Sequence, residues 1–198
     1  MAGVGVVQAV EAEQGVEVDR AACLVLGGLA VRDADRGQVP VPGLERIAWA
    51  DAKSDDARAC ERTLGQVQEE FDHSKPDDDP DWVYWLSQQE IDVMAGRCYT
   101  ELGKPKLAEP LLANAIAGYD HALARESSLY LSWLAEDHIQ LNDLDQAARI
   151  ATEALELASR TNSARTDERL RHLAKRLKPH SSVAKVAEFL DLYRSLID

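Results

Sequence analysis

Apolar residues recur at intervals of three and four through most of the chain after Ala48, which is the spacing of one face of an α-helix. Ala, Leu, Glu, Arg and Gln dominate this region, and all five have high helix propensity. The breaks between the periodic segments are short, apart from a longer loop at 73–81. Because helices joined by short turns lie antiparallel, the pattern predicts an all-α fold of stacked helical hairpins.

The loop at 73–81 contains two prolines and four aspartates, which cannot continue a helix. His73 and these aspartates could hold a hard cation, but the spacing is not that of an EF-hand. We therefore expect a solvated, helix-capping loop and no metal. Residues 1–40 form a poorly defined N-terminal segment, for which we predict two helices, and 36–43 should be a linker. The repeat domain is expected to occupy 41–198.

An internal repeat points to one kind of hairpin stack. The tetratricopeptide spacing of small, aromatic and apolar positions is matched by Gly96, Tyr99, the Leu102–Gly103 turn, Ala108, Leu112 and Ala115. A second copy follows 39 residues later, from Ala135 to Ala154, and a third 36 residues further on, from Arg171 to Leu190. A degenerate copy begins upstream at Ala48. The repeats predict a tetratricopeptide-like right-handed solenoid, with a generic helical bundle as the alternative.

Three segments resemble a known class of domain: PDDDPDWVYWLSQQEIDVMAGRCYTELGKPKLAEPLL, YLSWLAEDHIQLNDLDQAARIATEALELA and SARTDERLRHLAKRLKPHSSVAKVAEFLD. They resemble the C-terminal tetratricopeptide-like halves of actinobacterial transcriptional regulators, in which a helix-turn-helix domain precedes the repeats. The resemblance implies a regulatory role. Residues 1–50 show no helix-turn-helix and no basic recognition helix, so DNA binding is not carried over. The chain would be a stand-alone repeat protein or a fragment of a regulator.

The charge balance excludes several partners. The chain has 22 Lys and Arg against 35 Asp and Glu, a formal net charge of −13, which argues against nucleic acids and anionic membranes. The longest apolar run, Ala21–Val31, is too short to cross a bilayer. Cys23, Cys60 and Cys98 form no CxxC pair. We therefore expect neither a disulfide framework nor a zinc site. The same cysteine usage predicts a cytoplasmic location.

Catalytic signatures are missing from the sequence. It contains no GxSxG, P-loop or GxGxxG motif, and its five histidines are scattered. We expect a non-enzymatic protein without a cofactor. One alternative is an all-helical enzyme with an unrecognised site, which needs titratable residues that converge in a pocket. Another is a structural dimerisation module of a larger regulator. The aromatic residues Trp82, Tyr84 and Trp85 could form a binding platform, but core packing is the simpler interpretation.

A binding face can be projected from the repeat pattern, because the first helix of each tetratricopeptide hairpin lines the concave surface. The candidate partner-binding residues are Arg97, Glu101, Glu136, Gln140, Arg165, His172, Lys175 and Arg176. The region 160–185 carries a net charge of +6, against −19 for the rest of the chain. We therefore expect an acidic protein or peptide at the basic end of this groove, with a homodimer as a possible assembly. The alternative for these basic side chains is a solvated helix face.

Overall fold

The computed structural model describes residues 41–73, 87–118, 124–161 and 163–197. Every regular element in these ranges is a helix, which confirms the all-α class. The α-helices are α3 (Val41–Lys53), α4 (Ala57–His73), α5 (Gln88–Glu101), α6 (Pro105–Ala117), α7 (Ala124–Gln140), α8 (Leu144–Ala158), α9 (Ala164–Leu177) and α10 (Ala184–Ile197). A short 3-10 helix, η2 (Lys178–His180), separates α9 from α10.

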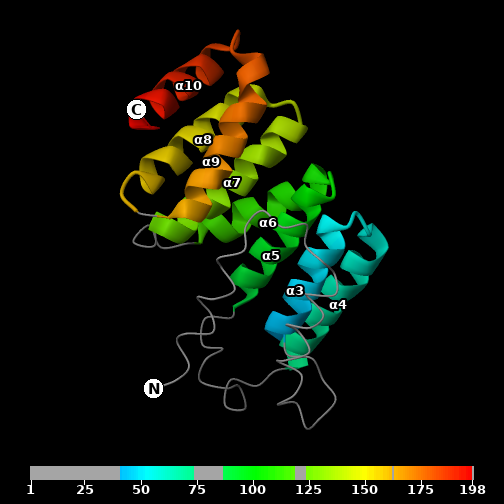
Figure 1. Ribbon diagram of the computed structural model, residues 1–198. Coiled ribbons are helices and arrows are strands. Elements are labelled where there is room, and N and C mark those ends of the chain that lie inside the picture. The colour runs from blue at the N-terminus through cyan, green and yellow to red at the C-terminus, as the bar shows by residue number, and fades with distance from the viewer. Residues whose placement is uncertain (1–40, 74–86, 119–123, 162, 198) are drawn as a thin grey trace.

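Successive helices pair as hairpins: α3 with α4, α5 with α6, and α7 with α8 (Figure 1). The first helices, α3, α5, α7 and α9, also pack against one another in sequence order. We call these four helices the first-helix row. The last helix departs from the pairing, because α10 packs mainly against α8 and less against α9. The first-helix row therefore brings together side chains that lie far apart in the sequence.

The hairpin turns use residues that accept a left-handed backbone. Asp55, Gly103 and Asn142 have φ values of 58°, 65° and 60°, a region that glycine, Asn and Asp tolerate best. The helix after the last of these turns is capped by Asp143, whose carboxylate accepts a hydrogen bond from the Gln146 backbone N–H at 3.3 Å. Ser163 caps α9 in the same way through the Thr166 N–H. These turns stop one helix and start its antiparallel partner.

Small residues allow the two helices of a hairpin to approach, as the repeat predicts. A Cβ added at Gly96 of α5 would lie 2.6 Å from Cγ of Leu112 on α6. Ala135 on α7 is fully buried in the equivalent position, and Ala174 on α9, buried too, follows Ala135 at the same interval. The third repeat as predicted, starting at Arg171, is therefore wrong by three residues. Arg171 is exposed, whereas Ala174 fills the buried small-residue position.

Replacing Gly96 with alanine should lower the free energy of unfolding by about 1–3 kcal/mol, because Leu112 is fully buried and has little room to move. Gly65 is the matched control. It also lies inside a helix, but nothing stands within 4 Å of an added Cβ, so Gly65→Ala should stabilise the protein by about 0.5–1 kcal/mol. Urea denaturation of both variants measures the difference. Equal effects of the two substitutions would contradict this account of the α5–α6 contact.

The N-terminal boundary of the repeat domain needs one correction. The linker predicted over 36–43 is wrong at its end, because α3 begins at Val41 and includes Pro42 and Gly43; proline suits the first turn of a helix. The predicted loop begins where α4 ends, at His73. The rest of that loop, the two predicted helices in 1–40, Cys23 and the aromatic residues Trp82, Tyr84 and Trp85 lie outside the described residues.

Cys60 on α4 and Cys98 on α5 are buried free thiols in one core cluster. A side-chain hydrogen bond to Cys60, together with burial, raises the pKa of the Cys98 thiol. The two cysteines fill space between the first two hairpins. The expectation that the cysteines form no disulfide framework stays a prediction.

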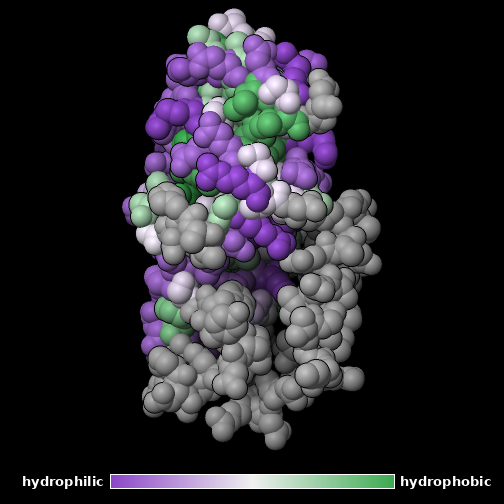
Figure 2. Space-filling view, turned by 90° about the vertical axis from the view of Figure 1, so that its left-hand side faces the viewer, coloured by the Kyte–Doolittle hydropathy of each residue, from purple (hydrophilic) through white to green (hydrophobic). Residues whose placement is uncertain are grey.

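The described surface is mostly hydrophilic on the side shown in Figure 2, with hydrophobic residues gathered towards the end of the molecule that contains α8 and α10. Leu196 on α10 is 50% exposed, and Leu157 and Leu192 are half-buried. A homodimer stays a prediction. In the part of the chain that the structure describes, no helix has both the length and the apolar character needed to cross a membrane.

Candidate partner-binding face and cavity

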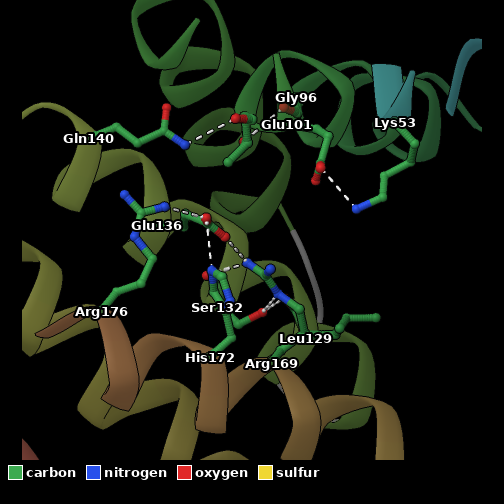
Figure 3. A network of polar contacts seen from close by, with 11 residues as sticks. Lys53, Gly96, Glu101, Leu129, Ser132, Glu136, Gln140, Arg169, His172 and Arg176 are labelled. Carbon is green, nitrogen blue, oxygen red and sulfur yellow. Dashed lines mark hydrogen bonds and ion pairs between the residues drawn. The ribbon is translucent and has the colours of Figure 1, made fainter. Parts of the chain in front are cut away.

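Glu136 on α7 is the centre of a polar network that joins α7 to α9 (Figure 3). Its carboxylate accepts hydrogen bonds from Arg169 at 2.5 Å and Arg176 at 2.7 Å, and lies 3.1 Å from Nε2 of His172. Arg169 also donates to the hydroxyl and the carbonyl oxygen of Ser132, one turn earlier on α7. The three cationic or titratable side chains come from three turns of α9 and converge on one buried carboxylate.

This network shifts the acidity of Glu136. Burial by itself raises the pKa of a carboxyl group, but the hydrogen bond to His172 and the charge of Arg169 outweigh burial and hold the pKa of Glu136 at about 2. The carboxylate is therefore ionised throughout the neutral range. One negative charge faces two arginines, so the surroundings of Glu136 carry surplus positive charge.

Two tryptophans hold a second arginine in the first-helix row. The guanidinium of Arg97 on α5 lies 4.9 Å from the ring centre of Trp49 on α3 and 5.4 Å from that of Trp133 on α7. The two rings meet edge to face at 5.5 Å, and Arg169 stacks on Trp133 at 3.5 Å. Cation–π contacts thus run from α3 through α5 and α7 to α9.

Arg97 borders a cavity of about 240 Å³ between α3, α5 and α7. Its other charged and polar walls are Glu45, Arg46, Glu90 and Tyr130. Arg97 is 9% exposed, and its Nε has no hydrogen-bond partner. Burial and the positive charges of Arg165 and Arg169 lower its pKa to about 10. The guanidinium is therefore still charged at neutral pH.

The opposite wall of the cavity is acidic. Glu45 on α3 is 5% exposed, and its Oε1 has no hydrogen-bond partner. Burial, reinforced by the nearby charge of Glu90, raises the pKa of Glu45 to about 7. Glu90 on α5 accepts a hydrogen bond from the Tyr130 hydroxyl at 2.8 Å. The cavity therefore combines a buried cation with two neighbouring carboxyl groups.

The remaining candidate residues divide between paired and unpaired side chains. Glu101 forms an ion pair of 2.8 Å with Lys53 of α3, and Nε2 of Gln140 donates to the Thr100 carbonyl oxygen at 3.0 Å. Arg165 is half-buried and Lys175 exposed, and neither has an ion pair or hydrogen bond within the described ranges. Of the eight predicted residues, the structure gathers Glu136, His172 and Arg176 into one network.

A buried carboxyl group lies directly behind this face. Asp137 on α7 is fully buried, and neither of its oxygens has a hydrogen-bond partner in the part of the chain that the structure describes. The neighbouring Thr100 hydroxyl donates instead to the Gly96 carbonyl oxygen at 2.9 Å. Burial, with the charges of Glu136 and Glu109 adding to it, raises the pKa of Asp137 to about 7. This group is protonated in much of the mildly acidic range.

Sequence reasoning missed Arg169, Trp49, Trp133, Glu45 and Tyr130. Arg169 could have been found, because residues 165, 169, 172 and 176 share one helix face. Glu45 and Trp49 lie four residues apart on α3, but Trp133 and Tyr130 lie on α7, and no local spacing connects the two helices. Arg97 and Glu136 were predicted as open groove contacts, but both are buried by the adjacent first helices.

A scan against protein-family models, a search of the curated proteins and a search of the solved structures each find no match to this chain. The resemblance to the tetratricopeptide-like halves of regulators therefore stays a prediction. Within 41–73, 87–118, 124–161 and 163–197, no cluster of His, Cys, Asp and Glu could hold a metal ion. The loop that suggested a cation lies outside these ranges, except for His73.

Proposed function

We propose that the chain is a non-catalytic binding domain that holds an acidic protein or peptide on the face of its first-helix row. The observation that carries the proposal is the surplus positive charge at α9, where Arg169 and Arg176 share the one carboxylate of Glu136 and Arg165 has no partner in the described residues. In a protein with a net charge of −13, such a region attracts an acidic partner and suppresses others.

The arrangement of the hairpins supports a tetratricopeptide-like array as the framework of this domain. Small residues recur where paired helices approach, and the first helices pack in a row. The resemblance of residues 76–198 adds a regulatory role, related to transcription. The proposed location is the cytoplasm. Because repeats contact mainly their neighbours, a partner bound along the row would change how the hairpins bend.

Charge reversal at Arg165 and Lys175 tests the binding face. Both side chains are unpaired, whereas Arg97 and Arg176 are held by other residues and their reversal would disturb the fold. We expect Arg165→Glu/Lys175→Glu to weaken capture of an acidic partner at least tenfold, since long-range attraction turns into repulsion. Affinity purification with the full chain, followed by mass spectrometry and titration of the captured partner, measures the loss.

The matched control is Arg149→Glu/Lys185→Glu, which changes the net charge equally on α8 and α10, outside the first-helix row. Both of these side chains are exposed. This control should retain the partner. Equal retention by both double variants would show that the partner does not use the face at α9.

An all-helical enzyme is the second candidate, and the cavity is the observation that favours it. Glu45 has a pKa of about 7 and faces a cavity with Arg97 and Tyr130, which suits a general base. The test is to incubate the purified protein with compounds that bind it. Recovery of these compounds unchanged supports the proposal that the chain is a non-catalytic binding domain. Conversion that stops in Glu45→Gln supports the enzyme.

A further inference from the structure

The cavity between α3, α5 and α7 has properties that a partner on α9 does not explain. Its volume is about 240 Å³. A cavity of about 150 Å³ holds a benzene molecule, so this one has room for roughly ten non-hydrogen atoms. Val93, Met94 and Pro42 supply an apolar wall. The space therefore suits a small molecule with a short apolar group rather than a folded partner.

At one side of this cavity, Arg97 would be stabilised by a bound anion. The guanidinium is nine-tenths buried, and among the described residues its Nε has no hydrogen-bond partner and no carboxylate forms an ion pair with it. The aromatic rings of Trp49 and Trp133 attract the cation but supply no acceptor in the plane of the guanidinium. Burying a charge without a partner is costly, and a carboxylate entering the cavity would remove that cost.

At the other side of the cavity, Glu45 would be stabilised by a bound cation that donates a hydrogen bond. Its carboxyl group is buried, and one of its oxygens has no hydrogen-bond partner among the described residues. The nearby charge of Glu90 repels its negative charge, and the positive charges of Arg97 and Arg46 offset that repulsion in part. Glu90 is already bonded to the Tyr130 hydroxyl. An ammonium group placed against Glu45 would supply the missing hydrogen-bond donor and neutralise the repulsion between the two carboxylates.

We propose that this cavity binds a free α-amino acid with an apolar side chain, its carboxylate on Arg97, its ammonium group on Glu45 and its side chain against Val93 and Met94. An α-amino acid is the small molecule that carries both complementary charges on one carbon atom. The inference goes beyond the proposed function, because it gives the domain a small-molecule ligand in addition to a macromolecular partner.

Three related probes test the need for both charges. L-leucine carries both groups, N-acetyl-L-leucine lacks the ammonium group, and L-leucinamide lacks the carboxylate. In titration calorimetry with the full chain at pH 7, L-leucine should bind, and each analogue should bind about 10- to 100-fold more weakly because one charged hydrogen bond is lost. Equal affinity for L-leucine and either analogue, or no binding of L-leucine at 20 mM, would overturn the proposal.

Variants assign each charge to its residue. Arg97→Gln should weaken L-leucine binding about 10- to 100-fold, and Arg97→Lys, which keeps the charge, should weaken it less. Glu45→Gln should weaken binding and also abolish proton release, which the wild type should show in buffers of different ionisation enthalpy as Glu45 ionises beside the ammonium group.

The matched control for Arg97 is Arg149→Gln, an exposed arginine on α8 that does not line the cavity. It should bind L-leucine like the wild type. Wild-type affinity in Arg97→Gln, with circular dichroism showing that the variant is folded, would refute the assignment. The partner-capture experiment uses residues outside the cavity, so the two proposals can fail independently.

Discussion

Glu136→Gln should lower the free energy of unfolding by about 3 kcal/mol at pH 7, the largest single-residue effect that we expect on stability. The carboxylate is 7% exposed and joins Arg169, His172 and Arg176 of α9 to α7. Glutamine has no charge and cannot accept from both arginines with charge-assisted bonds. The substitution leaves Arg169, whose side chain is 15% exposed, without an anionic partner.

The loss should be measured by urea denaturation followed by circular dichroism, with Glu153→Gln as the control. Glu153 lies on α8, is exposed and has no ion pair with another described residue, so its substitution should change stability by less than about 0.5 kcal/mol. Because this network joins α9 to α7 in addition to their apolar contacts, amide exchange in α9 should accelerate more than in α5. A loss below about 1 kcal/mol would show that solvent already screens the network.

The sequence pattern anticipated more of the helix pairing than of the side-chain contacts. Gly96, Ala108 and Ala135 were recognisable because close helix packing requires small residues at a repeating interval, and the turns at Gly103 and Asn142 follow from residues that accept a positive φ. These features depend on local chemistry. The third repeat was misplaced by three residues because Leu177 follows Ala174 where the pattern has an aromatic residue, so nothing in the sequence fixes the register.

The binding face illustrates what a single sequence leaves out. Helical projection predicted Glu136 and Arg97 as contacts in an open groove, but it could not show how closely the next first helix approaches and buries them. Arg97 is enclosed by Trp49 and Trp133 from two other hairpins. Glu45 and Arg97 line the same cavity, although 51 residues lie between them in the sequence. Such pairings depend on the distances between helices, which residue spacing does not encode.

The wild-type protein should lose stability as the pH rises from 5 to 8, because Asp137 and Glu45 both have pKa values of about 7 in the folded state. Their ordinary values are 3.8 and 4.5. Between these limits the folded protein holds protons that the unfolded chain has released, so stability falls as the pH increases. Each group contributes about 1.4 kcal/mol per pH unit until the pH approaches 7, and together they remove about 5 kcal/mol.

The charges around each carboxyl group determine this effect. Asp137 is fully buried and faces the negative charges of Glu136 and Glu109, which the positive charge of Arg169 offsets in part. Glu45 faces Glu90 on one side and the arginines Arg97 and Arg46 on the other. Glu136 has a lowered pKa, so its ionisation increases stability as the pH rises. That increase occurs between about pH 2 and 4.5, below the range from pH 5 to 8.

Asp137→Asn isolates the larger of the two contributions. The amide cannot ionise, so the variant should be more stable than the wild type at pH 8 by about 2–4 kcal/mol and should depend on pH about half as strongly. Asp137→Asn/Glu45→Gln should be almost independent of pH between 5 and 7, whereas Glu153→Gln should follow the wild type. The measurement is the free energy of unfolding at half-unit pH intervals for each protein. If the free energies of the wild type and of Asp137→Asn change in parallel with pH, Asp137 is already ionised in the folded protein at pH 5.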